Sequence, residues 1–85
     1  MIILKIVRVG ASWCSSCLIM KSRFQEVLKD RTDIEIESYD YDFDEDKVLE
    51  YNIGDILPVY IRLDNQERII GEKSIEEIKK FIGEE

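Results

Sequence analysis

The sequence predicts a single α/β domain in which a small mixed sheet of four strands carries helices on both faces. The chain has 85 residues, which fits one domain, and we treat residues 1–85 as that domain. Residues 2–9 form a nearly continuous apolar run, typical of a central strand that is covered on both sides. The segments after it change between helical and strand periodicity, which gives the order β-α-β-α-β-β-α.

The first helix is expected at about 14–30, because apolar side chains recur there at helical spacing. They form one stripe along the helix: Cys17, Met20, Phe24, Val27 and Leu28. A second strand is expected at 34–39, where isoleucine alternates with glutamate as on a half-exposed edge. A strand, a helix and a strand in succession require a right-handed crossover, so these two strands should be parallel.

The second half of the chain is expected to add a short helix and a hairpin. The helix at about 45–52 should direct Val48 and Leu49 toward the core. Strands at 59–63 and 67–70 are separated by a polar turn and therefore predict an antiparallel hairpin.

The last helix, at 75–82, has clear signals at both ends. Ser74 and Glu77 have the spacing of a capping box, and Gly83 is placed where a helix commonly stops. The boundaries of this helix are therefore predicted on both sides.

Charge and composition exclude several functions. The net charge is −7, and a strongly acidic chain is a poor candidate for nucleic-acid binding, which depends on Lys and Arg. The chain has no histidine, which excludes His-based triads and zinc fingers with histidine ligands. The excess acidity lies mainly in residues 33–55, where Tyr39, Tyr41 and Phe43 are expected to pack on the sheet edge.

No metal, cofactor or membrane association is expected. The pattern Asp40-x-Asp42-x-Asp44 lacks the glycine and the final glutamate of an EF-hand loop. Two cysteines cannot close a four-cysteine zinc site within one chain. The apolar start is too short for a signal peptide and no transmembrane run follows, so a cytoplasmic protein is expected.

The two cysteines, Cys14 and Cys17, lie where the first strand ends and the first helix begins. Unpaired backbone N–H groups and the helix dipole stabilise a thiolate at such a position. Cys14 is expected to be the exposed nucleophile. Cys17, one helical turn on, is expected to face inward and to resolve a mixed disulfide. This exchange reaction needs no histidine.

Three other interpretations of this pair remain open. The cysteines could form a structural disulfide, although so short a loop restricts little chain entropy. They could be two inert buried thiols, although only Cys17 lies on the apolar stripe. They could also form half of an intersubunit metal or iron–sulfur site.

Two segments of the chain resemble thioredoxins. Residues 7–17, which contain Trp13-Cys14-Ser15-Ser16-Cys17, resemble the active-site segment of that family, and residues 51–58 resemble its second signature. The element order is similar to a thioredoxin fold without its first strand and helix, close to the minimal glutaredoxin-like arrangement.

The resemblance implies a thiol–disulfide oxidoreductase acting on protein disulfides, with Cys14 attacking and Cys17 resolving. It implies that Pro58 is a cis-proline near the disulfide and that the backbone of Leu57 pairs with an extended substrate segment. Trp13 would be a partly exposed aromatic residue beside the site. The implied partners are disulfide-containing proteins and a reductase or other thiol donor, and we expect a monomer.

The sequence departs from the family pattern at two places near the cysteines. Ser15 and Ser16 replace the family's Gly-Pro, and their hydroxyls could donate hydrogen bonds to the thiolate or cap the helix. Arg8 replaces the family's buried aspartate. It could favour a thiolate by its charge, or it could point to solvent from the end of the strand.

Two further functions are compatible with this sequence beside protein-disulfide reduction. One is a glutaredoxin-like, glutathione-linked reductase, although only one glycine, Gly71, follows the last strand where that family has a pair. The other is a non-catalytic binding module that uses the same fold as a scaffold.

Overall fold

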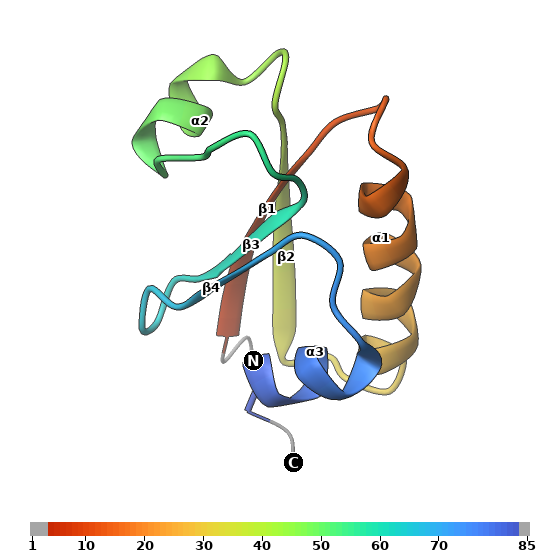
Figure 1. The fold of residues 1–85 in the computed structure, drawn as a ribbon. Coiled ribbons are helices and arrows are strands. Elements are labelled where there is room, and N and C mark those ends of the chain that lie inside the picture. The colour runs from red at the N-terminus through yellow and green to blue at the C-terminus, as the bar shows by residue number, and fades with distance from the viewer. Residues whose placement is uncertain (1–3, 84–85) are drawn as a thin grey trace.

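The computed structural model describes residues 4–83 and contains the predicted elements in the predicted order (Figure 1). They are β1 (Leu4–Gly10), α1 (Ser15–Leu28), β2 (Ile34–Asp40), α2 (Glu45–Glu50), β3 (Val59–Arg62), β4 (Arg68–Ile70) and α3 (Ile75–Phe81). The beginning of the predicted first strand, residues 2–3, lies outside the described residues. Among the helices between residues 4 and 83, none is long and apolar enough to cross a membrane.

The sheet has the strand order β2-β1-β3-β4 and is mixed, as the sequence predicts. β1 pairs in parallel with β2, whereas β3 is antiparallel to both of its neighbours. β1 is therefore a central strand, and its Ile6, Val7 and Val9 are completely buried. Burial on both faces explains why this segment lacks the alternation of a half-exposed strand.

The larger core lies between the sheet and the helices α1 and α3, which Figure 1 shows on the same side of the sheet. The rings of Phe24 and Tyr60 are stacked at its centre, with centroids 4.0 Å apart and planes 9° from parallel. The buried residues of this core are Leu4, Ile6, Met20, Phe24, Tyr60, Ile78, Phe81 and Ile82. The apolar stripe of α1 therefore faces the sheet.

The smaller core lies on the other face of the sheet and includes one of the two cysteines. Its buried residues are Val7, Val9, Cys14, Leu57, Val59 and Ile61. Val48 of α2 packs against it, and so do Tyr39 and Tyr41, as predicted for the sheet edge. The segment that begins α1 is thereby attached to the α2 side of the sheet.

Two apolar residues near α2 are exposed, so their predicted packing is wrong. Leu49 is 77% exposed because the six-residue α2 turns only one narrow face, with Val48, toward the sheet. Phe43 is 86% exposed. The Asp40 carboxylate accepts hydrogen bonds from the backbone N–H groups of Asp42 and Phe43, which fixes a turn that leaves the phenyl ring outside.

The capping box predicted for α3 is confirmed. The Ser74 hydroxyl accepts from the Glu77 backbone N–H at 3.2 Å, and the Glu77 carboxylate accepts from the Ser74 backbone N–H at 3.3 Å. Gly83 follows the helix with φ at +84°, the left-handed conformation that ends many helices.

The stacked pair predicts a large difference between two phenylalanines. Phe24→Ala removes a ring that is 1% exposed and should lower the free energy of unfolding by about 3–5 kcal/mol. Phe43→Ala, the matched control, should change it by less than about 0.5 kcal/mol. Urea unfolding followed by circular dichroism measures both, and equal effects would contradict the packing described here.

Candidate active site at Cys14 and Cys17

Cys14 is the N-cap residue of α1. Its backbone is extended, with φ −95° and ψ 109°, and its sulfur accepts a hydrogen bond from the backbone N–H of Cys17 at 3.2 Å. A tight turn in front of the helix is closed by the Cys14 backbone N–H, which donates to the Ala11 carbonyl at 3.2 Å. The sulfur therefore occupies the place of a capping hydroxyl, at the positive end of a 14-residue helix.

The two serines that follow Cys14 lie inside the helix. Ser15 and Ser16 are the first two residues of α1, so neither of them caps the helix. Ser15 is exposed and Ser16 is half-buried. The expected alternative of a serine cap is thus replaced by a cysteine cap.

Cys14 is less exposed than the sequence led us to expect. Its exposed fraction is 8%, whereas Cys17 is half-buried, and both are free thiols. The expectation of an exposed nucleophile is wrong because Cys14 packs in the smaller core with Leu57 and Val59. Little of Cys14 is therefore open to a reaction partner.

Cys17 lies against the end of β1. A Cβ atom placed on Gly10 would come within 3.2 Å of the Cys17 sulfur, so the absence of a side chain at Gly10 gives the sulfur its space. Burial, and after it the hydrogen bond with Cys14, raise the pKa of Cys17 to about 11, and the positive charge of Arg8 opposes this rise. Cys17 is therefore a protonated thiol at neutral pH.

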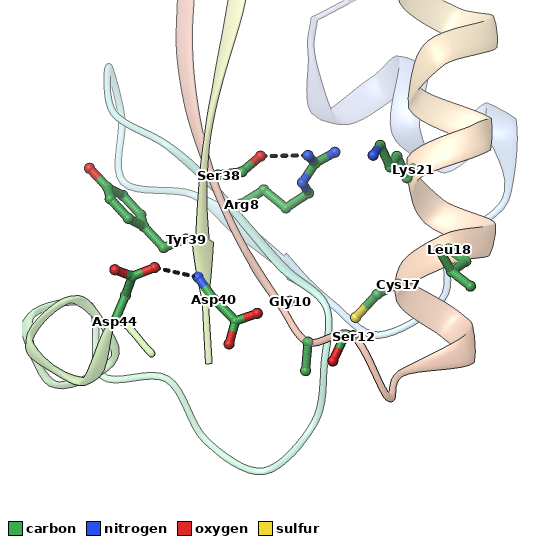
Figure 2. A pocket seen from close by; sticks show the side chains of 11 residues that line it. Arg8, Gly10, Ser12, Cys17, Leu18, Lys21, Ser38, Tyr39, Asp40 and Asp44 are labelled. Carbon is green, nitrogen blue, oxygen red and sulfur yellow. Dashed lines mark hydrogen bonds between the residues drawn. The ribbon is translucent and has the colours of Figure 1, made fainter. Parts of the chain in front are cut away.

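Arg8 points between the sheet and α1, not away from the molecule. It is half-buried and lies directly opposite Tyr60 in the register of β1 and β3. Its guanidinium donates a hydrogen bond to the Ser38 hydroxyl on β2. Arg8 and Cys17 line the same cavity, of about 380 Å³, and Figure 2 shows both side chains directed into it.

Trp13 stands exposed beside the cysteines and is held by the acidic loop. It is 63% exposed, and its indole Nε1 donates to the Asp42 carboxylate at 2.8 Å. The Tyr41 ring meets it edge to face, with centroids 6.4 Å apart. Asp42 could not be recognised in this role from the sequence, because spacing along the chain does not reveal a contact between residues 29 positions apart.

Leu57 and Pro58 directly precede β3, and both are buried. The peptide bond between them is cis. Leu57 belongs to the same buried cluster as Cys14, while its neighbour Ile56 is 64% exposed. The fold thus brings the two segments that suggested the family, 7–17 and 51–58, together at one end of the sheet.

The arrangement is suited to thiol chemistry. Two free thiols lie one helical turn apart at a helix N-terminus, and a backbone N–H is directed at the first sulfur. Within residues 4–83, no three His, Cys, Asp or Glu side chains are grouped so that they could hold a metal ion. The fold and the site together define a small thioredoxin-fold protein with a dithiol pair.

Comparison with known proteins gives the family. The family model described as thioredoxin matches residues 3–84, and the chain belongs to the thioredoxin family. A search of curated proteins found no match.

Solved thioredoxin structures are similar over most of this chain. Thioredoxin-2 of the malaria parasite superposes with a TM-score of 0.82 at 20% identity, covering 94% of this chain and 81% of the other. Mitochondrial thioredoxin 3 from Saccharomyces cerevisiae gives 0.81 at 19% identity, covering 94% and 76%. A thioredoxin from Nicotiana alata gives 0.79 at 28% identity, covering 93% and 70%.

The raised pKa of Cys17 predicts slow alkylation at neutral pH. In a Cys14→Ser variant, the rate of reaction with iodoacetamide should rise about tenfold per pH unit and level off only above pH 9, because only the thiolate reacts. Mass spectrometry of the alkylated chain measures the rate. A plateau at or below pH 9, the ordinary value for a thiol, would contradict the described burial.

Proposed function

We propose that this protein is a thiol–disulfide oxidoreductase that reduces disulfides in other proteins. The observation that carries the proposal is the sulfur of Cys14 at the N-cap of α1, with the N–H of Cys17 donating to it at 3.2 Å. A backbone donor and the positive end of a helix both face this sulfur, an arrangement typical of a reactive cysteine and not of an inert buried one. Membership of the thioredoxin family supports the same chemistry.

In the first step, the Cys14 thiolate attacks one sulfur of a substrate disulfide. The substrate S–S bond breaks, a bond forms between the Cys14 sulfur and the substrate sulfur, and the other substrate sulfur leaves as a thiolate that takes a proton from water. The Cys17 N–H faces the Cys14 sulfur, at the end of α1 where the helix dipole favours negative charge.

In the second step, Cys17 loses its proton and attacks the Cys14 sulfur. The mixed disulfide breaks, the second substrate thiolate leaves, and a Cys14–Cys17 disulfide remains. The substrate has then gained two electrons and the protein has lost two. A reductase or another thiol donor returns them and restores the dithiol.

The surface around Cys14 suits an extended substrate segment. We assign the backbone of Leu57 to pairing with that segment and Pro58 to the wall of the site, because both precede β3 next to the cluster that holds Cys14. Trp13 and Ile56, each more than 60% exposed, supply apolar contacts at the rim. Ser15 and Ser16 modulate the thiolate from the first turn of α1.

The proposed setting is a reducing compartment such as the cytoplasm, with the protein acting as a monomer. The partners are proteins with disulfides and a thiol electron donor. A net charge of −7 argues against nucleic acid as a partner. This setting supports a reductant because the thiol pools there maintain the dithiol form.

Single substitutions of the cysteines test the reaction. Cys14→Ser should reduce the rate of insulin reduction by dithiothreitol to the uncatalysed level, because no attacking sulfur remains. Cys17→Ser should give a covalent mixed disulfide with the substrate that is visible on a non-reducing gel, because no resolving thiol remains. Ser22→Ala, on the exposed side of the same helix, serves as the control.

Full activity of the Cys14→Ser variant would show that the assigned nucleophile is wrong. A dithiol that reduces no disulfide at all would instead support a binding module.

Trp13 tests substrate docking separately from the chemistry. Trp13→Ala should raise KM for a protein disulfide about fivefold, since loss of an exposed aromatic contact costs about 1 kcal/mol, and should leave the reaction with a small disulfide reagent unchanged. Steady-state kinetics with both substrates measures the difference. Equal losses of activity with both substrates would show that Trp13 holds the cysteines in position and does not bind the substrate.

A further inference from the structure

The cavity beside α1 places positive charge next to the resolving cysteine. Arg8, Cys17 and Lys21 all line it, from β1 and from two successive turns of α1 (Figure 2). The first step of the proposed reaction concerns Cys14, at the helix end. Of the two cysteines, only Cys17 lines the cavity, and its thiol must lose a proton before the second step.

We propose that Arg8 is a fixed cation that stabilises the Cys17 thiolate as it forms, while the proton leaves to water in the cavity. This role rests on the proposed function, because only a resolving cysteine needs a stabilised thiolate. The effect of the Arg8 charge on the Cys17 thiol can be measured in the folded chain without catalysis. The resolving cysteine would then be activated by a positive charge, and no carboxylate base would be needed.

Arg8 and Gly10 lie on the same face of β1, toward α1. Side chains two residues apart in a strand point to the same face and are separated by about 6.5–7 Å. Gly10 and Arg8 have this relation, and the Cys17 sulfur lies over Gly10. The guanidinium is held on the same face by its hydrogen bond to Ser38 on the neighbouring strand.

Burial decides between the two cations. Lys21 is exposed, so water and salt screen its charge, whereas Arg8 is half-buried and is screened less. An arginine also keeps its charge at every pH at which the protein is folded, and it cannot act as a proton acceptor. Arg8 therefore supplies a permanent positive charge near Cys17 and takes no part in proton transfer.

The two tyrosines near Cys17 and the other cysteine do not act as its base. Tyr60, from β3, lies opposite Arg8, and burial raises the pKa of its hydroxyl more than the Arg8 guanidinium lowers it, so it remains neutral. Tyr39 is held above its ordinary pKa by its hydrogen bond to Glu37 and is also neutral. Cys14 is part of the mixed disulfide at this stage and carries no charge.

Two carboxylates line the same cavity, Asp40 and Asp44, and Asp40 is the register partner of Gly10 on β2. Both are used within their own loop. Asp40 accepts from two backbone N–H groups, and Asp44 accepts from the Asp40 backbone N–H at 2.7 Å (Figure 2). These hydrogen bonds order the loop after β2, and each engages one oxygen of its carboxylate. We assign the proton of Cys17 to water in the cavity.

The test measures the Cys17 thiolate directly, in a Cys14→Ser background, and does not require catalysis. The rate of alkylation by iodoacetamide at pH 8 is proportional to the fraction of thiolate. Arg8→Met should lower this rate about 3- to 10-fold, which corresponds to a pKa rise of about 0.5–1 unit. Arg8→Lys, which keeps the charge, should restore the rate to within about twofold.

Three further variants keep the outcome unambiguous. Lys29→Met removes an exposed positive charge from the far end of α1 and should leave the rate unchanged. Lys21→Met should lower it less than Arg8→Met does. Arg8→Gln is a second neutral variant that can still donate to Ser38, and circular dichroism shows which variants are folded.

An unchanged alkylation rate in either folded neutral variant would overturn the proposal. So would a larger loss in Lys21→Met than in Arg8→Met. In the chain with both cysteines, Arg8→Met should also lengthen the life of the mixed disulfide with a protein substrate. If alkylation responds as expected but no substrate is reduced by the unsubstituted protein, the proposed function fails while the charge effect on Cys17 stands.

Discussion

The hydrogen bond from the Cys17 backbone N–H to the Cys14 sulfur is the interaction on which the site depends. It makes a cysteine the cap of α1, and a cap must occupy a defined place relative to the helix axis. The first sulfur is thereby fixed at the positive end of the helix, and the second follows one turn later on the side facing β1. Any change that displaced the start of α1 would move both thiols together.

The rest of the fold holds that helix start in place from two sides. Met20 and Phe24 attach α1 to the larger core, while Cys14 itself packs into the smaller one on the opposite face of the sheet. β1 runs between these cores, and its last residue, Gly10, leaves room for the Cys17 sulfur. A small domain buries only a limited core. Because Cys14 belongs to that core, the same residue contributes to stability and to the proposed reaction. The same packing explains why Cys14 has so little exposed surface.

Much of the fold could be predicted because its signals are local. The apolar run of β1, the helical stripe from Cys17 to Leu28 and the Ser74–Glu77 box each depend on residues within a few turns of one another. The cysteine pair was evident for the same reason.

What could not be predicted depends on contacts between distant segments. The bond from Trp13 to Asp42, the burial of Cys14 against Leu57, and the exposure of Phe43 and Leu49 all follow from how the loops near α2 are placed. The two possible directions of Arg8 were equally compatible with the sequence, and only its pairing across from Tyr60 and its bond to Ser38 decide between them.

The central claim is that Cys14 and Cys17 form a reversible dithiol–disulfide pair that serves as a reductant. The most direct measurement is the redox equilibrium of the protein in graded mixtures of reduced and oxidised dithiothreitol, followed by mass spectrometry of trapped thiols. We expect one two-electron transition with an intramolecular disulfide and a potential below about −200 mV, in the range of reductants. A potential above about −180 mV, or a pair that forms no disulfide in any mixture, would contradict it.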